Sequence, residues 1–258
     1  MSLHVESTGH GPPLVLLHGW AMHSGLWMPV LPKLASRFRV HLADLPGHGH
    51  SASIAPYTLA GIASAVAAHC AWLPEPPTVL GWSLGGAVAL QWALDQPGAV
   101  AKLILVSTTP CFVARDDWPH AMSAETLRRF GDELGASYQS TLRRFMTLQL
   151  QGSDQARELL AGLRAQLGAR GMPTRQGLAD ALAALTSIDL RPRVGAIRQP
   201  ALVVAGDRDT LVPASAGAWL AATLPAGRLA SIPGAAHVPF LSHPETFFAA
   251  CEAFCDGR

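Results

Sequence analysis

Short apolar runs separated by turn residues recur along the chain and predict buried strands. Each run is almost continuously apolar and is three or four residues long. Strands that are covered on both faces have this pattern, because neither side of such a strand meets water. The predicted strands lie at Leu14–Leu17, Val40–Ala43, Thr78–Leu80, Leu103–Val106 and Ala201–Val204.

Amphipathic stretches lie between most of these strands and predict helices. They cover Leu26–Phe38, Leu59–Trp72 and Leu84–Gln96. A chain in which strands alternate with helices folds into a mostly parallel sheet with helices on both sides. The pattern therefore predicts the α/β class, with a twisted, mostly parallel sheet at its centre.

The alternation stops between about Pro110 and Asp189, where helical patterns follow one another without a strand. These patterns cover Ala124–Leu134, Ser137–Leu150, Gln155–Leu167 and Arg175–Leu185. We interpret this segment as a helical lid, residues 111–189, inserted in a core made of residues 1–110 and 190–258. The strand pattern resumes at Ala201.

The segment Gly81-Trp82-Ser83-Leu84-Gly85 closes one predicted strand and opens the next predicted helix. A serine at such a sharp turn stands clear of the sheet edge, because small residues on either side allow strand and helix to approach closely. We therefore predict that Ser83 is a catalytic nucleophile. The alternative is an ordinary glycine-rich turn.

A serine hydroxyl needs a base to take its proton and a third group to orient that base. His237 lies in a small-residue loop after a late apolar segment and is the predicted base, with a surface-loop histidine as the alternative. Asp207 and Asp209 both follow the strand at Ala201–Val204, and the residues alone leave the choice between them open. Either gives the chain order of serine, acid and histidine that is typical of α/β-hydrolases.

The oxyanion of an acyl-transfer reaction needs two hydrogen-bond donors. In this architecture one is the backbone N–H after the nucleophile, which is Leu84, and the other comes from a loop after an early strand. Trp20, in the loop that follows Leu14–Leu17, is the predicted second donor. His18 in the same loop is expected to be structural.

Charge and composition exclude several classes of function. Nineteen basic and eighteen acidic side chains give a net charge of +1, which provides no overall field for nucleic acid. The chain starts without a leader pattern and has no apolar run long enough to cross a membrane, so we expect a cytoplasmic monomer.

Metal, nucleotide and flavin signatures are missing from the sequence, and we expect neither a metal nor a cofactor. Four cysteines are expected to be buried free thiols, namely Cys70, Cys111, Cys251 and Cys255.

Several motifs together resemble the α/β-hydrolase superfamily over nearly the whole chain. They are His18-Gly19-Trp20, the segment 44–51, Gly81–Gly86, the segment 206–213 and Ala236-His237. Within that superfamily the chain is similar to the methyl ester esterases that act on pimeloyl-[acyl-carrier protein] in biotin synthesis. Pro110-Cys111-Phe112, Arg144-Phe145 and Leu148-Gln149 carry this narrower resemblance.

The resemblance implies Asp209 as the acid of the triad and a turn role for Asp207. It implies a serine carboxylesterase that hydrolyses the methyl ester of pimeloyl-[acyl-carrier protein] to the free pimeloyl carrier and methanol. The alternatives are a generic short-chain carboxylesterase, a carbon–carbon bond hydrolase and a ligand-binding module without catalysis. The implied substrate-binding residues are Trp20, Ser83, Leu84, Phe145, Met146, Thr147, Leu148, Gln149 and His237.

Phe145 and Leu148 would wall an acyl channel under the lid, and Trp20 and Trp82 would bound the ester pocket. Packing in the apolar core is the alternative, and we favour it for Leu148.

The lid sequence is locally basic. Six arginines and two acids lie between residues 143 and 175, an excess that suits an acidic acyl carrier protein. Solvated helix faces are the alternative. At two positions where the family has basic residues, this chain has Ser140 and Ala161 instead. The predicted docking residues are Arg143, Arg144, Arg157 and Arg164.

Overall fold

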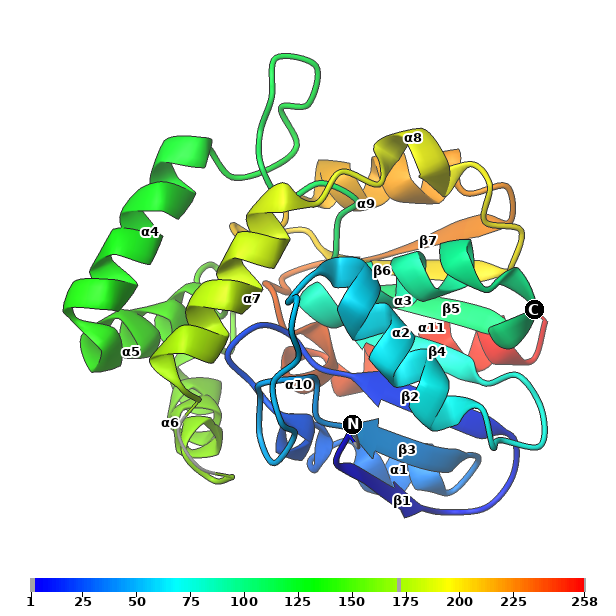
Figure 1. The fold of residues 1–258 in the computed structure, drawn as a ribbon. Helices are drawn as coiled ribbons and strands as arrows, with labels where there is room; N and C mark the ends of the chain where they lie inside the picture. Colours follow the sequence, from blue (N-terminus) through cyan, green and yellow to red (C-terminus); the bar gives the residue numbers. More distant parts are fainter. Residues whose placement is uncertain (1–2, 171–172, 258) are drawn as a thin grey trace.

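The computed structural model describes residues 3–170 and 173–257. Residues 1, 2 and 258 of the predicted core and residues 171 and 172 of the predicted lid lie outside the described residues. The described chain forms a seven-stranded sheet in the order β1-β3-β2-β4-β5-β6-β7 (Figure 1). The strands are β1 Val5–Thr8, β2 Pro13–Leu17, β3 Arg39–Ala43, β4 Thr78–Trp82, β5 Lys102–Val106, β6 Ala201–Gly206 and β7 Gly227–Ile232.

The α/β class and the mostly parallel sheet are confirmed. Only β1 runs antiparallel to its neighbour, β3, and all the other paired strands are parallel. Each predicted strand lies within an observed one, and the central strands β2, β4 and β6 are buried at every residue. The sequence analysis missed β1, because this half-exposed edge strand has no continuous apolar run.

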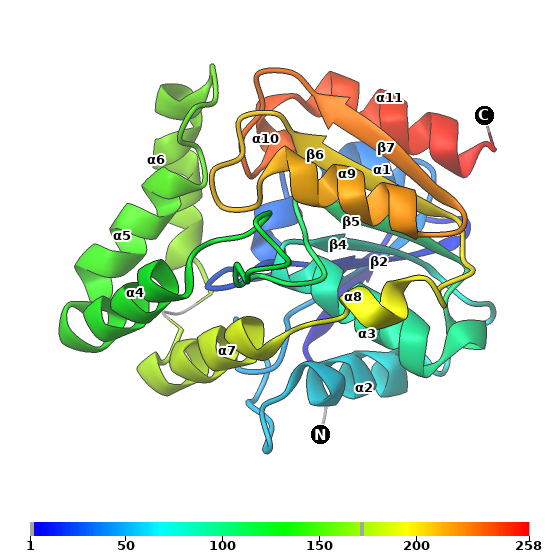
Figure 2. The same cartoon turned by 90° about the horizontal axis from the view of Figure 1, so that it is seen from above.

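Helices cover both faces of the sheet (Figure 2). One face carries α2, α3 and α9, and the other carries α1 and α11. Five further helices, α4 to α8, occupy the chain between β5 and β6, and the short α10 precedes α11. The bounds are α1 Leu31–Ala35, α2 Leu59–Cys70, α3 Leu84–Asp95, α4 Ala124–Ala136, α5 Tyr138–Leu148, α6 Ala156–Leu167, α7 Arg175–Ser187, α8 Arg191–Val194, α9 Ala214–Thr223, α10 Pro239–Ser242 and α11 Pro244–Cys255.

The single helix predicted over Leu26–Phe38 is wrong. The structure has a 3₁₀ turn, Ser24–Trp27, followed by the short α1, Leu31–Ala35. Pro29 lies between them. Proline has no N–H to continue a helix, so one amphipathic pattern becomes two short elements.

The helices α4 to α7 stand together beside the carboxyl ends of the central strands (Figure 1). Each begins and ends within two residues of a predicted helix. In the described part of the chain, no helix has both the length and the apolar character that crossing a membrane requires. All four cysteines are free thiols, two of them buried and two half-buried.

Glycines allow the strand β4, the helix α3 and the end of β2 to approach one another. A Cβ atom at Gly81 would lie 2.3 Å from the carbonyl oxygen of Gly85, and one at Gly85 would lie 2.2 Å from the carbonyl oxygen of Leu17. Real Cβ atoms do not come this close to backbone atoms, so these positions exclude any side chain. The position of α3 against the sheet depends on them.

Replacing Gly85→Ala should lower the free energy of unfolding by about 2 to 3 kcal/mol, because the new methyl group must push backbone apart in a packed core. Gly98→Ala is the matched control, since a Cβ there meets nothing within 4 Å. Urea unfolding of both variants measures the difference. Equal stability of the two variants would contradict the close approach.

Candidate active site

Ser83 lies at the turn between β4 and α3 in a strained backbone conformation, with φ 54° and ψ −117°. A non-glycine residue with positive φ costs free energy and persists only where its surroundings hold it. The backbone N–H of Ser83 donates to the carbonyl of Val106 at 2.9 Å, and the hydroxyl of Thr108 donates to the carbonyl of Ser83 at 2.7 Å. The neighbouring strand β5 and the residues after it therefore hold the turn from the side.

His237 and Asp209 form a buried pair. The Nδ1 atom of His237 lies 2.7 Å from Oδ2 of Asp209, and both side chains are almost fully buried. The other carboxylate oxygen of Asp209 accepts hydrogen bonds from the backbone N–H groups of Leu211 and Val212, both at 2.9 Å. The carboxylate is thus fixed by three contacts and holds the imidazole with Nε2 directed away from it.

Two further contacts hold the loop that carries His237. Its backbone N–H donates to the carbonyl of Gln149 at 3.1 Å, and the indole N–H of Trp82 donates to its carbonyl at 2.7 Å. Asp207 accepts a hydrogen bond from the backbone N–H of Gly234 at 2.8 Å and does not contact the imidazole. The sequence analysis placed Trp82 at the ester pocket, whereas the structure uses its indole to clamp the histidine loop.

Ser83 and His237 line the same cavity. Within the described residues, His237 is bonded to Asp209, and the Ser83 hydroxyl makes no hydrogen bond to the imidazole. Catalytic hydrogen bonds of this kind are frequently long without substrate and tighten when it binds. The structure thus holds Asp209 and His237 firmly and leaves the Ser83 hydroxyl free.

The backbone N–H groups of Trp20 and Leu84 flank the turn at Ser83. Leu84 is the first residue of α3, where the N–H groups of a helix have no partner within it and the helix dipole favours negative charge. Gly19 brings the preceding loop against the turn, because a Cβ there would lie 3.1 Å from Cβ of Ser83. Within residues 3–170 and 173–257, neither amide has a hydrogen-bond acceptor, which leaves both available to an oxyanion.

His18 fixes the loop that carries Trp20. Its Nε2 accepts from the backbone N–H of Leu45 at 2.9 Å, so its Nδ1 carries the proton and donates to the carbonyl of Gly19 at 2.8 Å. Burial, assisted by the nearby His48, lowers the pKa of His18 to about 3. The ring stays neutral near pH 7, in the one tautomer that satisfies both contacts.

The cavity above Ser83 is lined almost entirely by apolar side chains, most of them from the segment between β5 and β6. The ring of Trp20 packs edge to face with Phe130 and Phe145 at centroid distances of 5.4 and 4.9 Å, and its indole N–H donates to the carbonyl of Leu178 on α7 at 3.0 Å. The lining residues are Trp20, Ser83, Phe112, Met122, Leu127, Phe130, Phe145, Leu148, Leu182, Leu185, Leu211, Val212 and His237.

The segment 145–149 contributes to this cavity unevenly. Phe145 and Leu148 line it, so the core packing favoured for Leu148 is not what the structure shows. Met146 and Gln149 are fully buried, and Thr147 is exposed, with its hydroxyl bonded to the carbonyl of Arg143. None of these three lines the cavity. Gln149 contacts the loop of His237 through its backbone carbonyl. A pattern of side chains in the sequence cannot predict such a backbone contact.

The four predicted docking arginines all lie on exposed faces of α5 and α6. Arg144 forms an ion pair with Glu133 of α4, and Arg164 donates to the hydroxyl of Thr147 at 3.2 Å. Exposed contacts of this kind contribute little free energy and exchange readily for another partner.

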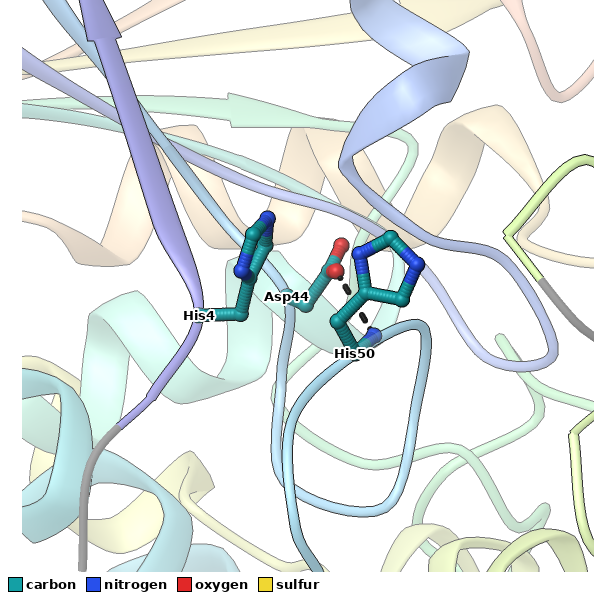
Figure 3. A group of neighbouring side chains, drawn as sticks. All are labelled: His4, Asp44 and His50. Carbon is teal, nitrogen blue, oxygen red and sulfur yellow. Dashed lines mark hydrogen bonds between the residues drawn. The ribbon is translucent and has the colours of Figure 1, made fainter.

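His4, Asp44 and His50 form a second polar cluster (Figure 3). Their potential ligand atoms lie within 4.8 Å of one another. However, the guanidinium of Arg170 lies 3.9 Å from Asp44 and 3.3 Å from His4, and Asp44 already accepts the backbone N–H of Ser24 and of His50. The positive charge of Arg170 would repel a metal ion at this point. The cluster instead links the segment after α6 to the sheet through hydrogen bonds and ion pairs.

The comparisons with known proteins agree with this geometry. A family model described as alpha/beta hydrolase fold matches residues 12–244. A protein from Nitrosomonas europaea named pimeloyl-[acyl-carrier protein] methyl ester esterase is 44% identical over 252 residues, which cover 98% of this chain and 99% of that relative. A protein of the same name from Methylococcus capsulatus is 46% identical, over 95% of each chain.

Solved structures show the same fold. An esterase from Exiguobacterium antarcticum has a TM-score of 0.90 at 24% identity, covering 98% of this chain and 94% of that one. A hydrolase from Pseudomonas aeruginosa has a TM-score of 0.83 at 28% identity, with the same coverage. The chain belongs to the α/β-hydrolase fold family.

Replacing Trp82→Phe should lower kcat about tenfold, because the ring stays while the histidine loop loses a hydrogen bond and shifts. Trp92→Phe is the matched control. The indole N–H of Trp92 is buried without a partner in the described structure, so its loss should leave kcat unchanged. Steady-state kinetics on a p-nitrophenyl ester measures both, and equal kcat values would argue against the clamp.

Proposed function

We propose that this protein is a serine carboxylesterase that hydrolyses the methyl ester of pimeloyl-[acyl-carrier protein], releasing methanol and the free pimeloyl carrier. The observation that carries the proposal is the buried pair of Asp209 and His237, because the imidazole of this pair lines the same apolar cavity as Ser83. The full-length relatives named for this activity, at 44% and 46% identity, support the substrate.

In the proposed reaction, Oγ of Ser83 attacks the ester carbonyl while Nε2 of His237 takes the hydroxyl proton. The backbone N–H groups of Trp20 and Leu84 bind the negative oxygen of the tetrahedral intermediate. His237 then gives its proton to the departing methoxide, which leaves as methanol. Water attacks the acyl-serine by the same route, and Asp209 keeps the imidazole in the tautomer that each step needs.

The apolar cavity suits the acyl chain of such a substrate. Its walls come mainly from the lid, residues 111–189, which we propose closes over the chain and excludes water from the ester. The aromatic group of Trp20, Phe130 and Phe145 provides one wall. The reaction uses only side chains and backbone amides, without a metal or another cofactor.

We further propose that the acyl carrier protein docks on the exposed arginines of α5 and α6. Arg143, Arg144, Arg157 and Arg164 form a basic surface on a chain whose net charge is only +1. A local charge of this kind steers an acidic partner and sets its orientation. The cytoplasmic location and the monomeric state stay predictions from the sequence.

Replacing Asp209→Asn should lower kcat by about 10⁴-fold, because the amide favours the wrong tautomer of His237. Asp207→Asn is the matched control, since its amide oxygen can still accept from Gly234, and we expect kcat within roughly threefold of wild type. Ser83→Ala should abolish turnover. Hydrolysis of p-nitrophenyl esters measures all three variants. Near wild-type activity of Ser83→Ala would remove the nucleophile from the proposal.

The double variant Arg144→Glu with Arg157→Glu should raise KM for carrier-bound methyl pimeloyl ester about tenfold or more and leave free dimethyl pimelate unchanged, because only the carrier meets these charges. Arg198→Glu, an exposed arginine before β6, is the control. Equal effects on both substrates would contradict docking. Equal turnover of both substrates by the wild type would favour a generic carboxylesterase.

A further inference from the structure

The turn that carries Trp20 contains a strained residue directly after it. The backbone N–H of Met22 donates to the carbonyl of Gly19 at 3.3 Å, which closes a four-residue turn over Trp20 and Ala21. Ala21 has a φ of 62°. Glycine ordinarily takes this position of a turn, because a side chain is strained at positive φ. Such strain persists only where the surrounding structure holds it, so the turn depends on contacts on both of its sides.

His18 holds the near side of the turn, and His23 holds the far side with both of its ring nitrogens. Nδ1 of His23 accepts the backbone N–H of Gly25 at 3.0 Å and so caps the 3₁₀ turn Ser24–Trp27. Because Nδ1 accepts a proton, Nε2 carries one and donates it to the backbone carbonyl of Gln166 at 2.5 Å. The residue is almost fully buried, and its ring lies close against Gly25.

Gln166 lies in the last turn of α6, so one imidazole ties this helix to the loop after Trp20. The end of α6 is itself held against the sheet. Both terminal nitrogens of Arg170 donate to the carboxylate of Glu6 on β1, at 2.5 and 2.9 Å, and the Arg170 side chain is only 15% exposed. The carbonyl that His23 binds therefore belongs to a fixed segment, and it can anchor the turn.

We propose that His23 is a positioning residue for the oxyanion: its hydrogen bond to Gln166 holds the strained turn, and the turn holds the backbone N–H of Trp20 in place. The inference rests on the proposed function and adds to it a side chain that does not line the cavity. An oxyanion donor acts when negative charge develops in the transition state. A displaced donor therefore lowers kcat and leaves KM unchanged.

Two substitutions separate the two contacts of the ring. His23→Asn keeps an acceptor near the place of Nδ1, and asparagine is a preferred cap, but its side chain is too short to reach Gln166. His23→Gln gives up the cap and places an amide N–H near the position of Nε2. On a p-nitrophenyl ester, His23→Asn should lower kcat about tenfold or more with KM within roughly twofold of wild type. His23→Gln should keep kcat within about threefold.

His41→Asn is the matched control. His41 is equally buried, but it lies on β3 and its ring bonds to the hydroxyl of Ser7, away from the loop of Trp20 and from α6. Its kcat should equal that of wild type. Titration with a labelled fluorophosphonate counts the active sites in each preparation, so kcat refers to folded enzyme. If His23→Asn does not fold, Arg170→Met releases the same end of α6 and should lower kcat severalfold with KM unchanged.

Hydrogen exchange measures the link itself. Amides of residues 163–169 should exchange faster in His23→Asn than in wild type, and His23→Gln should keep their protection. The proposal is overturned by a kcat loss that is equal in both His23 variants, confined to His23→Gln or absent from both. A rise in KM in place of the fall in kcat, or an unchanged kcat in Arg170→Met, also overturns it.

A wild type that hydrolyses no ester would instead overturn the proposed function. The contact between His23 and Gln166 is then judged by exchange alone. Equal exchange of residues 163–169 in wild type and His23→Asn would refute the link, whereas faster exchange in His23→Asn would keep it.

Discussion

The close approach of three backbone segments at the turn around Ser83 is the constraint on which the site depends. Gly85 touches the carbonyl of Leu17 and Gly81 touches that of Gly85, so β2, β4 and the start of α3 meet without side chains between them. This contact holds Ser83 at a positive φ and brings the first N–H of α3 beside its hydroxyl. One packing arrangement thus positions both the proposed nucleophile, Ser83, and the proposed oxyanion donor, Leu84.

A different set of contacts positions His237, the proposed base. His237 is held by a carboxylate after β6, an indole from β4 and a backbone carbonyl at the end of α5. The contact to Gln149 ties the catalytic loop to the segment between β5 and β6. That segment is therefore in contact with the loop of His237 as well as with the cavity, whose walls it largely forms.

Buried polar groups fix the backbone around the loop that carries Trp20. Neutral His18 bridges Gly19 and Leu45, and Asp44 accepts backbone N–H groups of Ser24 and His50. Since an unpaired buried polar group is costly, each satisfied contact fixes one backbone conformation. Arg170, three residues after α6, contacts Asp44 and also binds Glu6 of β1, which links this network to the segment after α6.

The sequence by itself determined five of the seven strands and the sharp turn at Ser83, because continuous apolar runs and glycines beside a serine are local signals of burial and of a tight turn. It left Asp207 and Asp209 open until the family resemblance was considered, and the structure places Asp209 on the imidazole and Asp207 on Gly234.

Tertiary structure alone decided that Trp82 clamps the histidine loop, that Leu148 faces the cavity and that His23 binds the end of α6. Trp82 and His237 are separated by 155 residues. No local pattern encodes such a contact, because it depends on how distant elements pack rather than on which elements form.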